Sequence, residues 1–193
     1  MGINLTKGQK ISLAKPDGSK LTKVRVGCGW DEAGGLFGGL IGSSSAIDLD
    51  ASVGTFSENN QLLEKIYFGN QQSRNRAIIH SGDNRTGKGE GDDEYIDIDL
   101  TAVDPEVKSI VVTINSYAGQ KFSKVKNCFS RLVDLTTNQE IAMYKLDDTG
   151  KDNTGLIMAK LYRHNGEWKM GAIGATCNGA TFQSIVPDII PFL

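Results

Sequence analysis

Short apolar runs, most of them alternating with polar residues, follow one another along almost the whole chain. Alternation places every second side chain on the same face of an extended chain, so these runs predict half-buried strands. The expected strands occupy residues 3–5, 20–30, 46–56, 61–70, 76–81, 94–100, 108–117, 127–135, 140–146, 156–164 and 167–174. Many short strands at regular spacing indicate an all-β protein, either a sandwich or a barrel.

Two turn sequences join neighbouring strands of this series into hairpins. Residues 136–139 read Thr-Thr-Asn-Gln, and residues 164–167 read His-Asn-Gly-Glu. Asn-Gly suits a type I′ turn, because both central residues of that turn need positive φ. Residues 103–107 predict a turn or a short helix, and residues 180–186 predict a helix that Pro187 ends. No repeat or linker divides the sequence, so we expect one domain over residues 1–193.

Charge and composition exclude several classes of protein. The formal net charge of −2 gives no basic field, so no nucleic-acid partner is expected. No apolar run approaches the roughly 20 residues of a membrane span. The first residues, MGINLTKG, lack the features of a secretory signal, and the cysteines show no zinc or disulfide spacing. We therefore expect a cytoplasmic protein whose cysteines, Cys28, Cys128 and Cys177, are buried and reduced.

Residues 81–100, SGDNRTGKGEGDDEYIDIDL, combine glycines with acids and resemble two known binding loops. A phosphate-binding loop would match residues 82–88, but Gly89 stands where Ser or Thr should hold magnesium, and acids follow where a helix should begin. An EF-hand would span residues 83–94, but its third and sixth positions are basic and its flanks are strand-like. The segment fits neither motif.

The charge of this segment nevertheless indicates a cation. Between Asp83 and Glu94 there are five acids and two bases, an excess of three negative charges. Carboxylates about 4 Å apart repel each other by roughly 1 kcal/mol in water and about 4 kcal/mol near a protein surface. A folded loop of this kind therefore either extends into solvent or binds a cation. Hard oxygen ligands in an adaptable glycine-rich loop suit calcium better than zinc or copper.

A second acidic pair supports a cation site. Asp48 and Asp50 are two residues apart on an expected strand, so both point to one face while Ile47, Leu49 and Ala51 take the core face. Two neighbouring carboxylates on a half-buried face need a partner, which a shared cation supplies. The alternative is that both face water. Further along, the pair at residues 97 and 99 has the same alternation, and we interpret it as a solvated face.

These segments, taken together, match the pattern of a known family. GCGWD at 27–31, IDLDAS at 47–52, HSGDNRTGKGEGDDEYIDIDL at 80–100 and LYRHNGEWKMGAIG at 161–174 resemble the TerD family of tellurite-resistance and stress-response proteins. The resemblance spans nearly the whole chain. It implies a β-sandwich of two sheets with short helical segments, a protein that is not an enzyme, and calcium bound at one end. It also implies membrane-associated protein partners in a tellurite-resistance complex.

The resemblance also implies a set of calcium ligands drawn from separate parts of the chain. They are Asp31, Asp48, Asp50, Asn70, Asp83, Asn84, Gly87 through its backbone carbonyl, Glu90, Asp92, Asp93 and Glu94. The acids are numerous enough for two Ca²⁺ ions that share bridging carboxylates.

Two classes of function stay open at this point. The first is a calcium-dependent sensor or scaffold in the cytoplasm, with peripheral contact to the inner face of the membrane through the glycine-rich apolar loop at 34–45; alternatively, that loop folds back on the sandwich or packs against a second copy. The second class is a metal-dependent hydrolase or nuclease that uses the same carboxylates. The two histidines, His80 and His164, fall at a strand end and in a hairpin, and no nucleophile motif accompanies them.

Overall fold

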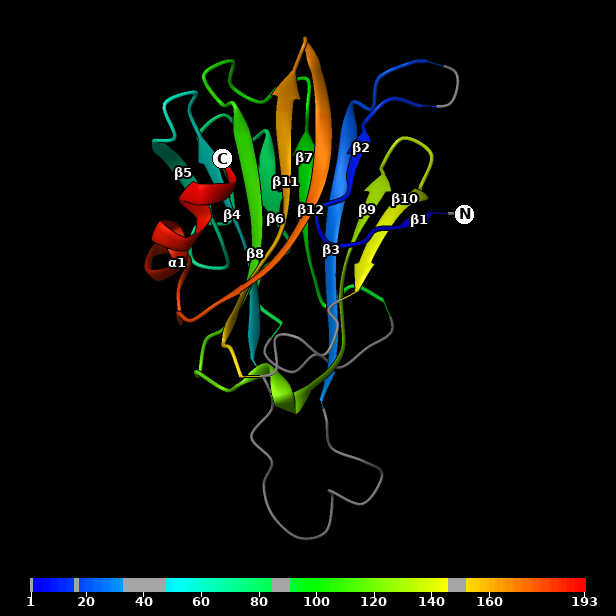
Figure 1. The fold of residues 1–193 in the computed structure, drawn as a ribbon. Coiled ribbons are helices and arrows are strands. Elements are labelled where there is room, and N and C mark those ends of the chain that lie inside the picture. Colours follow the sequence, from blue (N-terminus) through cyan, green and yellow to red (C-terminus); the bar gives the residue numbers. More distant parts are fainter. Residues whose placement is uncertain (1, 16–17, 33–47, 85–90, 146–151) are drawn as a thin grey trace, which may run out of the picture.

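Two six-stranded sheets lie face to face in the computed structural model of the chain (Figure 1). The structure describes residues 2–15, 18–32, 48–84, 91–145 and 152–193. Within these ranges one α-helix and two short 3-10 helices accompany the strands. The predicted β-sandwich of two sheets with short helical segments is confirmed.

The first sheet has the strand order β1-β10-β9-β3-β7-β6. Its strands are β1 (Ile3–Asn4), β3 (Lys23–Glu32), β6 (Ile78–His80), β7 (Glu94–Asp99), β9 (Val125–Asp134) and β10 (Gln139–Lys145). The second sheet has the order β2-β12-β11-β8-β4-β5. Its strands are β2 (Lys10–Ser12), β4 (Leu49–Phe56), β5 (Leu62–Ile66), β8 (Ser109–Ser116), β11 (Gly155–His164) and β12 (Glu167–Cys177). Every expected strand is found, and β2 is a strand that the sequence pattern did not predict.

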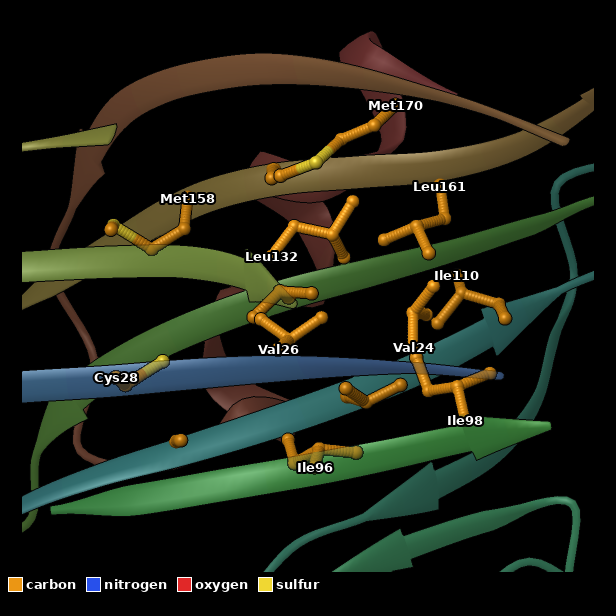
Figure 2. Packing of buried hydrophobic residues seen from close by; sticks show 14 of the residues in the cluster. Val24, Val26, Cys28, Ile96, Ile98, Ile110, Leu132, Met158, Leu161 and Met170 are labelled. Carbon is orange, nitrogen blue, oxygen red and sulfur yellow. The ribbon is translucent and has the colours of Figure 1, made fainter. Parts of the chain in front are cut away.

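Apolar side chains from both sheets fill the space between them (Figure 2). The alternation of β3 and β7 places its apolar members there, because each strand turns every second side chain toward the other sheet. The contributing residues that Figure 2 labels include Val24, Val26, Ile96, Ile98, Met158 and Leu161. Cys28, Cys128 and Cys177 are buried free thiols, as predicted. Burial of this apolar surface is the main force that holds the two sheets together.

The two predicted hairpins are confirmed. The turn between β11 and β12 has positive φ at Asn165 (51°) and Gly166 (75°), the backbone that a type I′ turn requires. The turn between β9 and β10 also uses a left-handed asparagine, Asn138, with φ of 56°. The segment 103–107 forms a turn, as one of its two predicted alternatives.

The helix α1 (Phe182–Ile189) covers the outer face of the second sheet, beside β4, β5 and β8 in Figure 1. The prediction that Pro187 ends this helix is wrong, because Pro187 lies inside α1 and the 3-10 helix η3 (Ile190–Phe192) continues it. Proline removes one backbone hydrogen bond of the helix. Ile185 and Ile189 are nevertheless fully buried against the sheet, and this burial stabilises the helix on both sides of Pro187.

This cover explains why β4 and β8 are buried on both faces. Phe182 of α1 packs over Gly54, where an added Cβ would lie 2.2 Å from the ring of Phe182. The 3-10 helix η1 (Phe122–Lys124) precedes β9. None of the helices in the described part of the chain is both long enough and apolar enough to cross a membrane.

Candidate metal centre

Three of the predicted ligands meet at one end of the sandwich. Asp48 and Asp50 come from the start of β4, and Asp83 follows β6. One carboxylate oxygen from each lies within 4.8 Å of the others. Asp50 is only 3% exposed, Asp48 is half-buried and Asp83 is exposed. We call these three residues the aspartate cluster.

The local sequence of β4 sets the direction of Asp50. Leu49 and Ala51 are fully buried between the sheets, as predicted, so Asp50 between them points to the opposite face. Ile47, which was expected on the core face, lies outside the described residues. The predicted alternation therefore holds for the described part of this segment.

Two buried side chains of the first sheet attach β4 to the segment that carries Asp83. His80 at the end of β6 donates from Nε2 to the carbonyl oxygen of Ala51 at 2.9 Å, and its Nδ1 accepts the N–H of Gly82 at 3.0 Å. Burial lowers the pKa of His80, so the ring is neutral and this pair of contacts assigns the proton to Nε2. The 3.6 Å approach of Nε2 to Glu94 is consequently not an ion pair. His80 therefore has a structural role in this geometry.

Glu94 supplies the second attachment. Its Oε2 accepts the N–H of Ala51 at 2.7 Å, and its Oε1 accepts the N–H of Asn84 at 3.1 Å. The pKa of Glu94 is raised to about 8, chiefly by burial and also by the negative charges of Asp50 and Asp83, while the two N–H donors act in the opposite direction. Glu94 therefore holds both acidic segments in place through their main chain.

The electrostatics of the aspartate cluster are unfavourable without a cation. The pKa of Asp50 is raised to about 7, chiefly by burial and also by repulsion from Asp48 and Asp83. The Oδ2 atom of Asp50 is buried and has no hydrogen-bond partner among the described residues. A buried carboxylate oxygen of this kind is stabilised by a partner of positive charge. The cluster thus has the donor chemistry, hard oxygen atoms of separate carboxylates, that calcium prefers.

Asn84, which follows Asp83 in the chain, is hydrogen-bonded to Asp93. The Nδ2 atom of Asn84 donates to the carbonyl oxygen of Asp93 at 3.2 Å and to its Oδ1 at 3.3 Å. The other carboxylate oxygen of Asp93 accepts the N–H of Trp30 at 2.8 Å, and the N–H of Asp93 donates to the carbonyl oxygen of Cys28 at 2.8 Å. These contacts fasten the end of the acidic segment to β3.

Asp92 has a different environment, which the sequence did not indicate. Arg131 of β9 donates to both of its oxygens, from Nε at 2.7 Å and from Nη2 at 3.1 Å. Gly27 makes room for this pair, because an added Cβ at Gly27 would lie 2.2 Å from the carboxylate. Gly27 and Arg131 face each other in the β3–β9 register, so only the pairing of the strands identifies Arg131.

The other predicted ligands are placed as follows. The amide of Asn70 donates to the carbonyl oxygen of Lys65 at 2.7 Å. Gly87 and Glu90 lie outside the described residues, and so does the side chain of Asp31, although its backbone belongs to β3. Asp97 and Asp99, which were expected on a solvated face, lie outside the core and are half-buried. Asp97 lies 2.7 Å from Arg25, and Asp99 lies 3.3 Å from Lys23.

Comparison with known proteins bears on the family and the fold of the chain. A family model described as the TerD domain matches residues 1–188. Tellurium resistance protein TerZ of Serratia marcescens is 40% identical over 190 residues, with 97% of each chain covered. Stress response protein SCP2 of Bacillus subtilis (strain 168) is 41% identical over 197 residues, with 96% of this chain and 98% of the relative covered. A crystal structure of a homologue of telluride resistance protein (TerD) from Streptomyces coelicolor A3(2) has the same fold, with a TM-score of 0.70 at 18% identity over 86% of this chain and 95% of that one.

Proposed function

The chain belongs to the TerD family, and on that premise we propose that it is a calcium-binding stress-response protein of the tellurium-resistance type. It acts as a sensor or scaffold and not as an enzyme. The names of its relatives, which refer to resistance and stress response, support the biological role. The aspartate cluster supports the calcium-binding part.

Asp48, Asp50 and Asp83 would hold the ion in this proposal. One observation carries it: three carboxylates from two segments converge within 4.8 Å, and the buried one has an oxygen without a hydrogen-bond partner among the described residues. Bound calcium supplies positive charge that offsets the repulsion between the three groups. Asn84, the neighbour of Asp83 in the chain, and its hydrogen-bond partner Asp93 would contribute to a second ion.

Calorimetric titration of EDTA-treated protein with calcium, and separately with magnesium, tests this proposal. We expect saturable binding with calcium preferred, and a gain in unfolding free energy of about 2.7 kcal/mol at a calcium concentration one hundred times the Kd. Because a proton competes for Asp50, whose pKa is about 7, calcium affinity should rise between pH 6 and pH 8. An unchanged melting curve across millimolar calcium would remove the proposal.

The alternative of a metal-dependent hydrolase or nuclease predicts turnover instead of binding alone. His80 has both ring nitrogens engaged with backbone groups, and His164 lies in the β11–β12 hairpin. Neither is therefore arranged as a general base for the aspartate cluster. Hydrolysis of a phosphodiester or ester substrate that disappears in Asp83→Asn would favour the enzyme and overturn the non-enzymatic proposal.

The proposal includes a place of action in the cytoplasm, with membrane-associated protein partners and peripheral membrane contact. The glycine-rich apolar segment 34–45 suggested for this contact lies outside the described residues, so its sequence alone supports the idea. Co-sedimentation with phospholipid vesicles, with and without calcium, measures it. Equal pelleting under the two conditions would contradict calcium-dependent membrane contact while leaving calcium binding itself intact.

A further inference from the structure

A small cavity lies on the outer face of the second sheet, between β5 and the first turn of α1, which Figure 1 shows side by side. Its volume is about 220 Å³. This is smaller than the roughly 300–1,000 Å³ of pockets that enclose whole drug-sized ligands, so it suits a small group and not a large cofactor. Asp50 contributes to its lining, so the cavity borders the aspartate cluster.

The most deeply buried part of the lining is polar. Asp50, Ser52 and Asn115 are 3%, 3% and 2% exposed, and Asp50 faces Asn115 directly across the β4–β8 pair. The Oδ2 atom of Asp50 and the Oδ1 atom of Asn115 are both buried without a hydrogen-bond partner among the described residues. The amide nitrogen of Asn115 donates to the carbonyl oxygen of Ala180 at 2.9 Å, which fixes Oδ1 as the acceptor left over. The base of the cavity therefore offers acceptors and a negative charge.

Aromatic rings form one wall of the cavity. Tyr67 meets Phe68 edge to face with ring centroids 5.5 Å apart, and Phe68 meets Tyr117 in the same way at 5.8 Å. We call these three rings the aromatic wall. Lys65 places its ammonium 5.9 Å from the centroid of Tyr67 and 3.4 Å from Oε1 of Gln183. The wall thus already accepts one ammonium group at its rim, as aromatic rings do for cations.

From these features we propose that the cavity binds a primary alkylammonium group. Its N–H donors reach the carboxylate of Asp50 and the amide oxygen of Asn115, while its methylene groups lie against the aromatic wall. An ammonium group has three donors and no acceptor, which matches a base made of acceptors. An anion is disfavoured, because Asp50 would repel it. The same group occurs in a free small amine and in a lysine side chain of a peptide, and the experiment below separates these sources.

The inference goes beyond calcium binding and does not depend on it. Asp50 is nevertheless shared, since it belongs to the aspartate cluster and to the cavity. If calcium also binds there, it reduces the negative charge available to the amine. Each ligand would then weaken the binding of the other by the same factor, because such coupling is reciprocal.

The test is a titration of EDTA-treated, ¹⁵N-labelled protein with n-butylammonium chloride, followed by amide chemical shifts. We expect saturable shifts in β4, β8 and the first turn of α1, with an affinity at least about tenfold higher than for n-butanol. Sodium chloride at matched ionic strength should not reproduce them. A parallel titration with Nα-acetyl-lysine amide represents a lysine side chain of a peptide. Binding as tight as that of n-butylammonium assigns the site to lysine side chains, and weaker binding assigns it to free amines.

Matched variants locate the ligand. Tyr117→Ala removes a ring that is 55% exposed, so the fold should survive and ammonium affinity should fall about threefold. Tyr162→Ala, the same change on β11 outside the cavity lining, is the control and should leave the affinity unchanged. Asp50→Asn should lower ammonium affinity at least tenfold. Asp48→Asn, which alters the cluster but not the lining, should lower it no more than threefold.

Several outcomes would overturn the inference. Equal binding of n-butanol would show a merely apolar cavity, and absence of saturable shifts would show that water suffices for the buried oxygens. Weaker n-butylammonium binding in Lys65→Met would also contradict the inference, because removing a positive charge from the rim should strengthen or preserve the binding of a cation. A final titration in saturating calcium should show reduced ammonium affinity. Only this titration in calcium rests on the proposed calcium function. If ammonium binds in EDTA and calcium does not weaken that binding, the result contradicts calcium binding at Asp50 and leaves the ammonium site intact.

Discussion

Aspartates in two regions of the molecule are neutralised in different ways. Around β7, Asp92 and Asp97 each receive two hydrogen bonds from an arginine, Arg131 and Arg25, with shortest distances of 2.7 Å. In the aspartate cluster the carboxylates lie next to one another, and each raises the pKa of Asp50. The paired acids carry their counter-charge within the fold. In the cluster, the buried Oδ2 atom of Asp50 has no hydrogen-bond partner among the described residues, and the proposed function supplies a cation to it.

This difference indicates which acids can report on solution conditions. A bidentate arginine pair keeps its charge over the whole physiological pH range, because the guanidinium stays protonated. A cluster of like charges changes its proton content or its bound cation as the medium changes. Under the proposed function, the cluster would be the part of the molecule that responds to solution conditions, whereas the arginine pairs join β3 and β9 to the chain around β7.

The largest expected effect is the pH dependence of the metal-free protein. Asp50 and Glu94 have pKa values of about 7 and 8 in the fold, above their usual values of 3.8 and 4.5. The folded state holds these protons more tightly, so stability should fall as pH rises from about 5 to 8. The upper limit is about 4 kcal/mol for Asp50 alone. Urea unfolding in EDTA measures this fall in stability. Stability that is flat or rises over this range would contradict the prediction that Asp50 and Glu94 respond to the pH of the solution.

The next effect comes from removing one clustered charge. At pH 8 without metal, Asp50→Asn should be more stable than the wild type by about 3 kcal/mol, because the cost of burying the charged carboxylate disappears, and with it the repulsion from Asp48 and Asp83. The same variant should lose most of its stabilisation by calcium. Asp188→Asn, an identical change at an exposed helix position, is the control and should shift neither quantity. A destabilised, calcium-responsive Asp50→Asn would show that Asp50 is not under electrostatic strain.

The strands were predictable because their signal is local. Alternation in β3 and β7 is visible in the sequence, and so is the Asn-Gly turn at Asn165. The strand β2 escaped because it is only three residues long, which is too short for its alternation to stand out from the flanking polar residues. The end of α1 was misjudged because Pro187 is a local signal, whereas the burial of Ile189 depends on the sheet beneath it.

The site was predictable only in part, for a related reason. The shared face of Asp48 and Asp50 follows from spacing along one strand, and the meeting with Asp83 was expected from the family resemblance. The partner of Asp92 is 39 residues away, and only strand register and the missing side chain of Gly27 bring Arg131 there. Which acid is paired within the fold is therefore a tertiary property that charge counting does not reveal.

A change at Arg131 tests the contribution of an arginine-paired acid, Asp92, to stability. Arg131→Met leaves the carboxylate of Asp92, whose side chain is 7% exposed, without its arginine. We expect a loss of about 2 kcal/mol in unfolding free energy, between the values for exposed and buried pairs. Adding Asp92→Asn should recover more than half of it, as a double-mutant cycle would show. A clear loss of calcium affinity in Asp92→Asn alone would place Asp92 among the metal ligands. It would then contradict the distinction between acids paired with arginine and acids of the aspartate cluster.

The smallest effect has the opposite pH sign and comes from Asp134 at the end of β9. Burial alone would raise the pKa of this carboxyl, but hydrogen bonds from Thr136, Lys15 and Thr137 outweigh it and lower the pKa to about 2. Thr136 donates from its N–H at 2.9 Å and from its hydroxyl at 2.7 Å, so the charged form organises the β9–β10 turn.

Because the folded pKa of Asp134 lies below the usual 3.8, its contribution is present above about pH 4 and is lost as pH falls toward 2. Asp134→Asn should therefore reduce stability at pH 6 by about 1 kcal/mol and leave it nearly unchanged at pH 2.5, where the wild-type carboxyl has begun to protonate. Urea unfolding of both proteins at the two pH values measures the difference. Calcium should not alter it, since Asp134 keeps its counter-charge, Lys15 at 3.1 Å, within the fold. The prediction is wrong if the difference in unfolding free energy between the two proteins grows toward pH 2.5 or disappears when calcium is added. Either result would show that Asp134, although paired inside the fold, responds to solution conditions as the aspartate cluster does.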